Sequence, residues 1–210
     1  MNHRLIEQFE RSGVDATFIV PEAPAVRSQS VQFPDLAALL HLVNQHTPLG
    51  TGPIIVLGHS FAHVTLRKWL KHPGIRHIVL LDALYSGRSE FKSWAEGDPS
   101  RRLTVIGRET DADSRKLVAS LGGRYLPSIP SKIPKTRVIG ATSQWEHDAI
   151  AGGGAVIPIV LRHTDLARVG RSKWVWIAGL LAIGTVVGGG VYVLRRRARN
   201  RPRRRQRRLR

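Results

Sequence analysis

Residues 54–65 read IIVLGHSFAHVT, and this stretch decides the fold. The run 54–57 is wholly β-branched or aliphatic, so it predicts a strand that is buried on both faces, as in a parallel sheet. The strand pattern stops at Gly58, and a helical pattern begins within a few residues. The chain must therefore turn sharply with Ser60 at the carboxyl end of the strand, which raises the question of a chemical role for this serine.

Working outward from this stretch, apolar strand patterns alternate with helical patterns along the chain. Together with 54–58, the predicted strands are 15–20, 77–82, 102–107 and 136–141. The predicted helices are 2–12, 34–45, 61–72, 111–121 and 155–163. Strands that alternate with helices and are apolar on both sides predict an α/β fold, with a mostly parallel sheet covered by helices on both faces.

The composition bounds the chemistry. The chain has 210 residues, which suits one domain with appendages. It contains no cysteine, so a disulfide framework and a thiolate metal site are excluded, and we expect neither a metal nor a cofactor. The net charge is +18, but eleven arginines lie within residues 195–210, and without them it is +7. The basic character therefore belongs mainly to the tail.

A membrane segment is predicted just before this tail. Residues 174–194 are uncharged over 21 positions, which is long enough for a helix to span a hydrocarbon core of about 30 Å. Trp174, Trp176 and Tyr192 stand near its two ends, where aromatic rings favour the membrane interface. We expect one globular domain at 1–163, a linker at 164–173, a single transmembrane helix and an arginine-rich tail.

The charges predict the orientation of this segment and its partners. The positive-inside rule keeps the tail cytoplasmic, in contact with anionic membrane lipid, and the domain then faces outward. The alternative is a tail-anchored protein with a cytoplasmic domain. Gly184 and Gly188 form a GxxxG spacing, which leaves a helix-mediated dimer open. The tail lacks interleaved aromatic residues, so it does not favour binding to nucleic acid.

The sharp turn has a familiar form. Gly58-His59-Ser60-Phe61-Ala62, between a strand and a helix, resembles the nucleophile elbow G-x-S-x-G of the α/β-hydrolase superfamily. It is similar to the HSGGY-type elbow of a small bacterial hydrolase-like group, with Phe61-Ala62 in place of two glycines. The resemblance extends over residues 1–163 and is strongest in IIVLGHSFAH, HIVLLDALYSG and WEHDAI.

The resemblance implies a catalytic triad and a function. Ser60 would be the nucleophile, His147 the base and Asp82 the acid, with the Phe61 N–H group as an oxyanion donor. Asp111 or Asp113 is the alternative acid. The implied protein is a membrane-anchored serine hydrolase that acts on an ester or amide of an unknown small molecule or cell-envelope substrate. The alternatives are a catalytically inactive, membrane-bound interaction domain and, for Ser60 itself, a helix cap.

The same resemblance implies a missing part. Superfamily members carry a strand and an oxyanion loop before the helix predicted at 2–12, and this sequence begins in that helix. We therefore expect the hydrolase-like domain to be N-terminally incomplete, with a true start further upstream. Strand 15–20 should then either leave a gap beside 54–58 or move in to pair with it.

Overall fold

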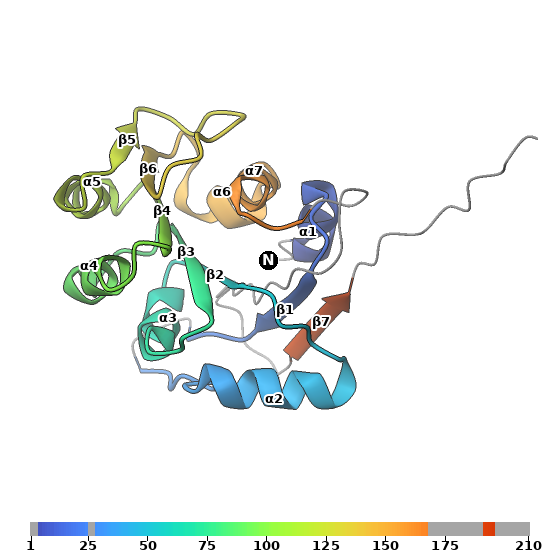
Figure 1. The fold of residues 1–210 in the computed structure, drawn as a ribbon. Coiled ribbons are helices and arrows are strands. Elements are labelled where there is room, and N and C mark those ends of the chain that lie inside the picture. Colours follow the sequence, from blue (N-terminus) through green and yellow to red (C-terminus); the bar gives the residue numbers. More distant parts are fainter. Residues whose placement is uncertain (1–3, 25–27, 168–190, 196–210) are drawn as a thin grey trace, which may run out of the picture.

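The computed structural model describes residues 4–24, 28–167 and 191–195 (Figure 1). Helices and strands alternate along the chain. In order, they are α1 (Leu5–Ser12), β1 (Thr17–Pro21), α2 (Leu36–His46), β2 (Ile54–His59), α3 (Ala62–Trp69), β3 (Ile75–Leu81), α4 (Arg88–Glu96), β4 (Arg102–Gly107), α5 (Asp111–Ser120), β5 (Arg124–Leu126), β6 (Val138–Thr142), α6 (His147–Gly152), α7 (Val156–His163) and β7 (Val191–Arg195).

Five strands form one parallel sheet in the order β2-β3-β4-β6-β5. The strands predicted at 54–58, 77–82, 102–107 and 136–141 are β2, β3, β4 and β6, so the α/β class and the parallel sheet are confirmed. In the register, His59 pairs with Leu81, and Leu81 pairs with Ile106. The carboxyl ends of β2, β3 and β4 therefore lie side by side.

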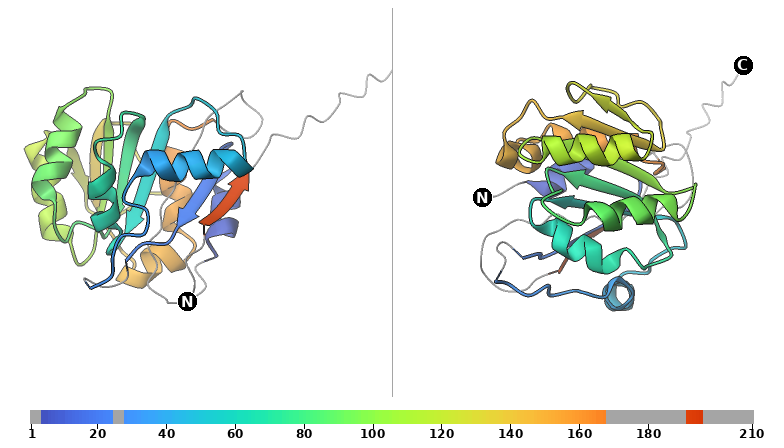
Figure 2. Two further views of the ribbon diagram at one scale, coloured as in Figure 1. Left: turned by 90° about the horizontal axis from the view of Figure 1, so that it is seen from below. Right: turned by 90° about the vertical axis from the view of Figure 1, so that its left-hand side faces the viewer.

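Helices cover both faces of this sheet. Helices α3, α4 and α5 lie on one face, and α1, α6 and α7 lie toward the other (Figures 1 and 2). Side chains of β2 alternate between two buried clusters: Ile54 and Val56 pack with Trp69 on the first face, and Ile55 and Leu57 pack in the cluster of the second. This alternation explains why the strand is apolar at every position.

The first predicted strand differs from the expectation. Strand β1 forms where 15–20 was predicted, but it lies outside the parallel sheet and pairs antiparallel with β7 over its whole length, from Thr17–Arg195 to Pro21–Val191. The prediction that this strand joins the parallel set is wrong. The backbone groups of one edge of β1 are satisfied by β7, and β1 forms no ladder with β2.

The structure describes only part of the membrane helix that is predicted at 174–194. Residues 174–190 lie outside the described residues. Residues 191–194 belong to β7 and pair with β1 in an extended conformation, which differs from the helix predicted for these four positions. Among the described residues, no helix has the length and apolar character needed to cross a membrane.

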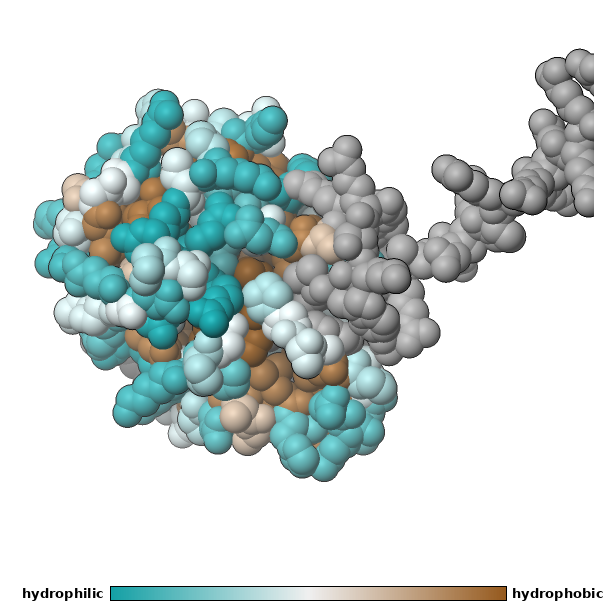
Figure 3. All heavy atoms as spheres, in the orientation of Figure 1, coloured by the Kyte–Doolittle hydropathy of each residue, from teal (hydrophilic) through white to brown (hydrophobic). Residues whose placement is uncertain are grey.

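Two helices and one strand were not predicted. Helix α4 carries Phe91, Trp94 and Ala95 on its buried face, a helical spacing that is readable in the sequence. Helix α6 has six residues and β5 has three, and such short elements show too little periodicity to be recognised. On the face seen in Figure 3, hydrophilic residues cover most of the described surface, and apolar residues gather toward its lower centre.

Two buried histidines meet at the amino-terminal edge of the sheet. The rings of His77 and His163 lie 5.8 Å apart, and His77 Nε2 lies 2.9 Å from the Thr104 hydroxyl. Burial, together with the charge of Arg102, lowers the pKa of His163 to about 4 and holds that of His77 well below its ordinary value. Both imidazoles are therefore neutral in the folded protein at neutral pH.

These histidines predict an acid-sensitive fold. Between about pH 6.5 and pH 4 the unfolded chain binds protons on them that the folded chain does not, so the free energy of unfolding should fall as pH drops through this window. Urea unfolding at pH 7.5 and 4.5 measures the fall. It should be smaller in His163→Gln than in the wild type, whereas His41→Gln, at an exposed histidine of α2, should leave it unchanged. Equal falls in all three proteins would contradict this prediction.

Candidate functional site

The candidate site lies at the carboxyl edge of the parallel sheet, beginning with Ser60. This serine occupies the turn between β2 and α3 with a φ of 53°, in the left-handed region that residues other than glycine rarely adopt. Its N–H group donates to the Leu81 carbonyl at 3.3 Å, which holds the turn against the end of β3. The turn is therefore as sharp as the sequence predicts.

Small residues on either side make room for this turn. A side chain at Gly58 would bring a Cβ atom within 2.7 Å of Leu66 and within 3.0 Å of the Ala62 methyl group, so this position requires glycine. Ala62 is fully buried, and its methyl group is accommodated where the resembled pattern has a second glycine. Alanine in place of the second glycine of that pattern therefore does not disrupt the turn.

Asp82 follows β3 in a similar strained conformation, with a φ of 46° and a fully buried side chain. Its carboxylate accepts hydrogen bonds from the backbone N–H groups of Arg108, Glu109 and Thr110 at 2.8, 3.1 and 2.9 Å. The Thr110 hydroxyl adds a fourth at 2.8 Å. The loop after β4 therefore wraps around a single carboxylate.

His147 is the first residue of α6, the helix that follows β6. Its Nδ1 lies 2.7 Å from Asp82 Oδ2. Because an ionised carboxylate can only accept, Nδ1 carries the proton, and Nε2 is left as the basic nitrogen. This is the arrangement in which a carboxylate orients an imidazole for proton transfer.

The hydrogen bond between Asp82 and His147 shifts the pKa of both groups. Burial alone raises the pKa of Asp82, but the hydrogen bonds from His147, Thr110 and Arg108 outweigh it and hold this pKa well below its ordinary range. The hydrogen bond to Asp82 raises the pKa of His147 against the lowering effect of burial. Asp82 is therefore ionised at neutral pH and stabilises the charged form of His147.

The other two carboxylates weighed as the acid have different partners. Asp111 accepts hydrogen bonds from Tyr125 and Thr142, each at 2.8 Å, and Asp113 forms an ion pair with Arg88 at 2.9 Å. Of the three carboxylates, Asp82 is the one that lies against His147 in the described part of the chain.

The structure brings Ser60 to the same edge but not into contact with the base. His59 pairs with Leu81, so Ser60 and Asp82 directly follow a pair of matched residues on neighbouring strands. Within the described residues, the Ser60 hydroxyl forms no hydrogen bond with His147. Such contacts often tighten only when substrate binds.

Phe61 also keeps its backbone donor available. Its N–H group forms no hydrogen bond within the part of the chain that the structure describes, and it lies at the start of α3, where N–H groups lack intrahelical partners.

His59 and Tyr85 contact the base, and sequence reasoning gave neither a role. The His59 ring lies 4.5 Å from that of His147, and its Nε2 donates to the His147 carbonyl at 2.9 Å. Burial lowers the pKa of His59 to about 4, and the nearby His147 adds to this effect, so His59 is neutral. The position of His59 directly before Ser60 was the feature of the sequence that could have identified it.

Tyr85 forms another wall of the site. Its hydroxyl donates to Glu109 at 2.6 Å and lies 3.4 Å from His147 Nδ1. Its ring lies 6.4 Å from the Phe61 ring and 6.1 Å from the His147 ring. Tyr85 therefore packs near both Phe61 and His147, and this could not be predicted because Tyr85 lies in a loop without periodicity.

Asp82, Glu109 and His147 are also close enough to share a cation, with ligand atoms within 4.8 Å of one another. Binding a cation would compete with the hydrogen bonds that Asp82 and His147 already form. The Asp82 carboxylate already accepts four hydrogen bonds from the 108–110 loop, and His147 Nδ1 is engaged with its second oxygen. The donor set as it stands fits a hydrogen-bonded pair better than a metal centre.

Comparison with protein-family models, with curated proteins and with solved structures found no match. The inference of function therefore rests on the geometry of this site and on the sequence pattern.

The Asp82–His147 pair can be tested directly by NMR. In Asp82→Asn, the pKa of His147 should fall, because the neutral amide no longer stabilises the imidazolium ion. A pH titration of the imidazole signals measures it in both proteins. Asp113→Asn is the matched control, because it also removes a carboxylate but one bound to Arg88, and it should leave the titration unchanged. An unaltered His147 titration in Asp82→Asn would argue against the pair.

Proposed function

We propose that the protein is a serine hydrolase of the α/β-hydrolase type that acts on an ester or amide carbonyl. The observation that carries this proposal is the Asp82–His147 hydrogen bond, at the sheet edge where Ser60 occupies a strained turn. A serine, a buried carboxylate and an imidazole in this chain order, each following a strand of one parallel sheet, form the set of groups that acyl transfer requires.

Each group has a distinct role in the proposed reaction. Ser60 Oγ attacks the carbonyl carbon while His147 Nε2 takes its proton, and the Phe61 N–H group donates to the oxyanion that forms. The protonated His147 then gives its proton to the leaving alcohol or amine, and the acyl group remains on Ser60. Water, activated by His147, attacks this acyl-enzyme and releases the acid, restoring Ser60. Asp82 keeps His147 oriented and stabilises its charged form throughout.

The rate should be modest. The Phe61 N–H group is the oxyanion donor that we identify among the described residues, and loss of a second donor typically costs about 10² to 10³ in rate. The chemistry proposed here therefore predicts detectable but slow turnover of an activated ester.

A second candidate is a hydrolase-like domain that binds a partner without catalysis. It is favoured by the Ser60 hydroxyl, which forms no hydrogen bond with His147 in the described part of the chain. The bulky Phe61, where the resembled group has glycine, also favours it, because a phenyl ring next to Ser60 leaves less room for a substrate than glycine would.

Labelling separates these two candidates. The full chain should react with a fluorophosphonate probe and should hydrolyse p-nitrophenyl acetate, and Ser60→Ala should lose the label and reduce hydrolysis by about 10³-fold or more. Ser93→Ala, at an exposed serine of α4, is the matched control and should behave as the wild type. Labelling that persists in Ser60→Ala, or no labelling of the wild type, would reject the hydrolase proposal and leave the binding domain.

We also propose that residues 174–194 anchor this domain to a membrane, with the tail cytoplasmic. The support is the sequence: 21 uncharged residues followed by an arginine-rich tail. A segment that crosses the membrane ends on the side opposite the domain, so residues 191–195 could not then pair with β1. The membrane anchor and the β1–β7 ladder therefore exclude each other. A span over residues 174–190 alone, at 1.5 Å per residue, would measure about 26 Å, at the short end of what a bilayer requires.

Fractionation decides between the two arrangements. If residues 174–194 span a membrane, the full chain should sediment with membranes and resist carbonate extraction, and a chain that ends at residue 170 should be released. Arg195 and the arginines after it should also be protected from added protease on the non-cytoplasmic side. Recovery of the full chain in the soluble fraction would favour the β1–β7 ladder and reject the anchor.

A further inference from the structure

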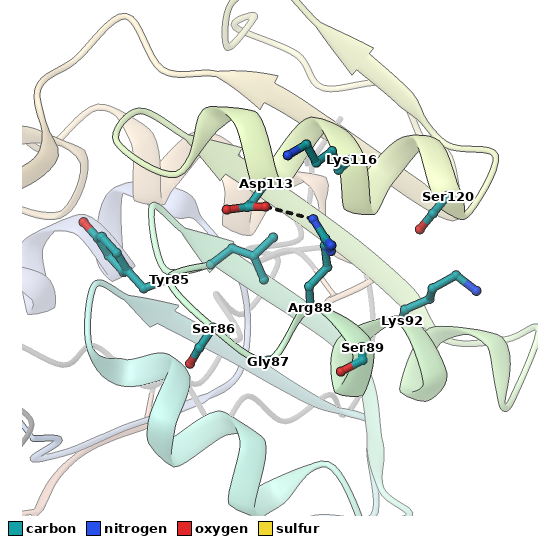
Figure 4. Close-up of a pocket in the computed structure, with 10 residues that line it drawn as sticks. Tyr85, Ser86, Gly87, Arg88, Ser89, Lys92, Asp113, Lys116 and Ser120 are labelled. Atoms are coloured by element: carbon teal, nitrogen blue, oxygen red, sulfur yellow. Dashed lines mark hydrogen bonds and ion pairs between the residues drawn. The ribbon is translucent and has the colours of Figure 1, made fainter.

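A cavity of about 630 Å³ lies between α4 and α5, beside the candidate site. Most of the residues that line it are polar or charged, and it opens to solvent. Figure 4 shows Arg88 at its centre, Lys116 and Asp113 on α5, and Lys92 and Ser120 toward its far end. The residues that line it are Leu84, Tyr85, Ser86, Gly87, Arg88, Ser89, Lys92, Asp113, Lys116 and Ser120.

The lining carries a surplus of positive charge. Three of its side chains are cationic, Arg88, Lys92 and Lys116, against a single carboxylate, Asp113. Arg88 is neutralised by its ion pair with Asp113 at 2.9 Å, and Lys92 pairs with Glu96. The Lys116 ammonium forms no ion pair or hydrogen bond within the described residues. Among the described residues, Lys116 is therefore a cation of this cavity without a partner, and Lys92 is a second whose partner lies outside the lining.

The local backbone adds to this field. Helix α4 begins at the cavity with Arg88, so the positive end of its dipole lies there. Its N-cap residue, Gly87, has no side chain to accept from the N–H groups of the first turn. The Ser86 hydroxyl accepts from Arg67 at 3.3 Å and keeps its own proton as a neutral donor, whereas the hydroxyls of Ser89 and Ser120 donate to Glu90 and to the Leu117 carbonyl. A group with several acceptor oxygens fits such a lining better than an apolar or cationic one.

Tyr85 connects the cavity to the candidate site. It lines the cavity, and its ring is also close to those of Phe61 and His147 at 6.4 and 6.1 Å. A substrate whose carbonyl lies at Ser60 can therefore extend past Tyr85 and place its other end between α4 and α5.

We propose that this cavity binds an acidic group of the substrate, a carboxylate or a phosphate, so that the enzyme prefers esters or amides that carry a negative charge away from the scissile bond. This inference rests on the proposed hydrolase function, because it assigns the far end of the same substrate. Lys116 is the principal ligand, and Lys92 and the first turn of α4 assist it.

Matched esters test the preference in the full chain. Hydrolysis of the p-nitrophenyl monoesters of succinate, glutarate and adipate is compared with that of the p-nitrophenyl butyrate, valerate and hexanoate esters, which have the same chain lengths without the terminal carboxylate. The ratio of kcat/KM for charged over neutral ester should be roughly three- to tenfold at one chain length or more, the effect expected of one or two partly exposed ion pairs.

Variants locate the effect. Lys116→Met should bring this ratio close to one, and 0.5 M salt should do the same in the wild type. Lys71→Met removes an equal charge from an exposed lysine after α3, away from the cavity, and should keep the wild-type ratio. A ratio near one at every chain length, or a ratio equally reduced by Lys71→Met, would overturn the inference.

A binding measurement separates this inference from the hydrolase proposal. NMR spectra of the ¹⁵N-labelled full chain carrying Ser60→Ala are recorded with glutarate, and separately with inorganic phosphate. Shift changes confined to α4 and α5 that disappear in Lys116→Met support the cavity, even if no ester is cleaved. The two probes show whether carboxylate or phosphate oxygens bind better. Absence of any change with both probes overturns the inference, even if neutral esters are hydrolysed.

Discussion

The buried carboxylate of Asp82 joins three segments that are distant in the sequence. It ends β3, accepts hydrogen bonds from the loop at 108–110 and holds His147 at the start of α6. An uncharged apolar side chain in its place would leave three backbone N–H groups and the imidazole without their partner. Each unpaired buried group costs about 1 to 3 kcal/mol, so this single residue supports both the loop geometry and the position of the base.

Strain concentrates at the same edge. Among the described residues, Arg4, Ser60 and Asp82 are the non-glycine positions with positive φ, and two of the three belong to the candidate site. The left-handed conformation costs roughly 1 to 2 kcal/mol for a residue with a Cβ atom, and glycine would avoid that cost. Ser60 and Asp82 nevertheless occupy these positions, and such strain is typical of functional sites.

The sequence predicts the sheet well because burial on both faces leaves a pattern at every position. Four parallel strands were predicted from apolar runs such as 54–58, and Ser60, Asp82 and His147 follow three of them. Hydrogen bonds from backbone N–H groups leave no such pattern in the sequence, so those that Asp82 accepts could not be predicted. The pairing of β1 with β7 depends on residues 170 or more positions apart, and no local signal records it.

The histidines show how the surroundings decide the chemistry of one residue type. His59 and His163 are buried without a carboxylate in hydrogen-bonding contact, and their pKa values fall to about 4. His147 is partly exposed and hydrogen-bonded to Asp82, so its pKa rises. A raised pKa makes His147 a stronger base, but it also requires a higher pH for the imidazole to be neutral. His59 stays neutral while it donates a hydrogen bond to the His147 carbonyl. It therefore adds no second positive charge that would oppose the stabilisation of charged His147 by Asp82.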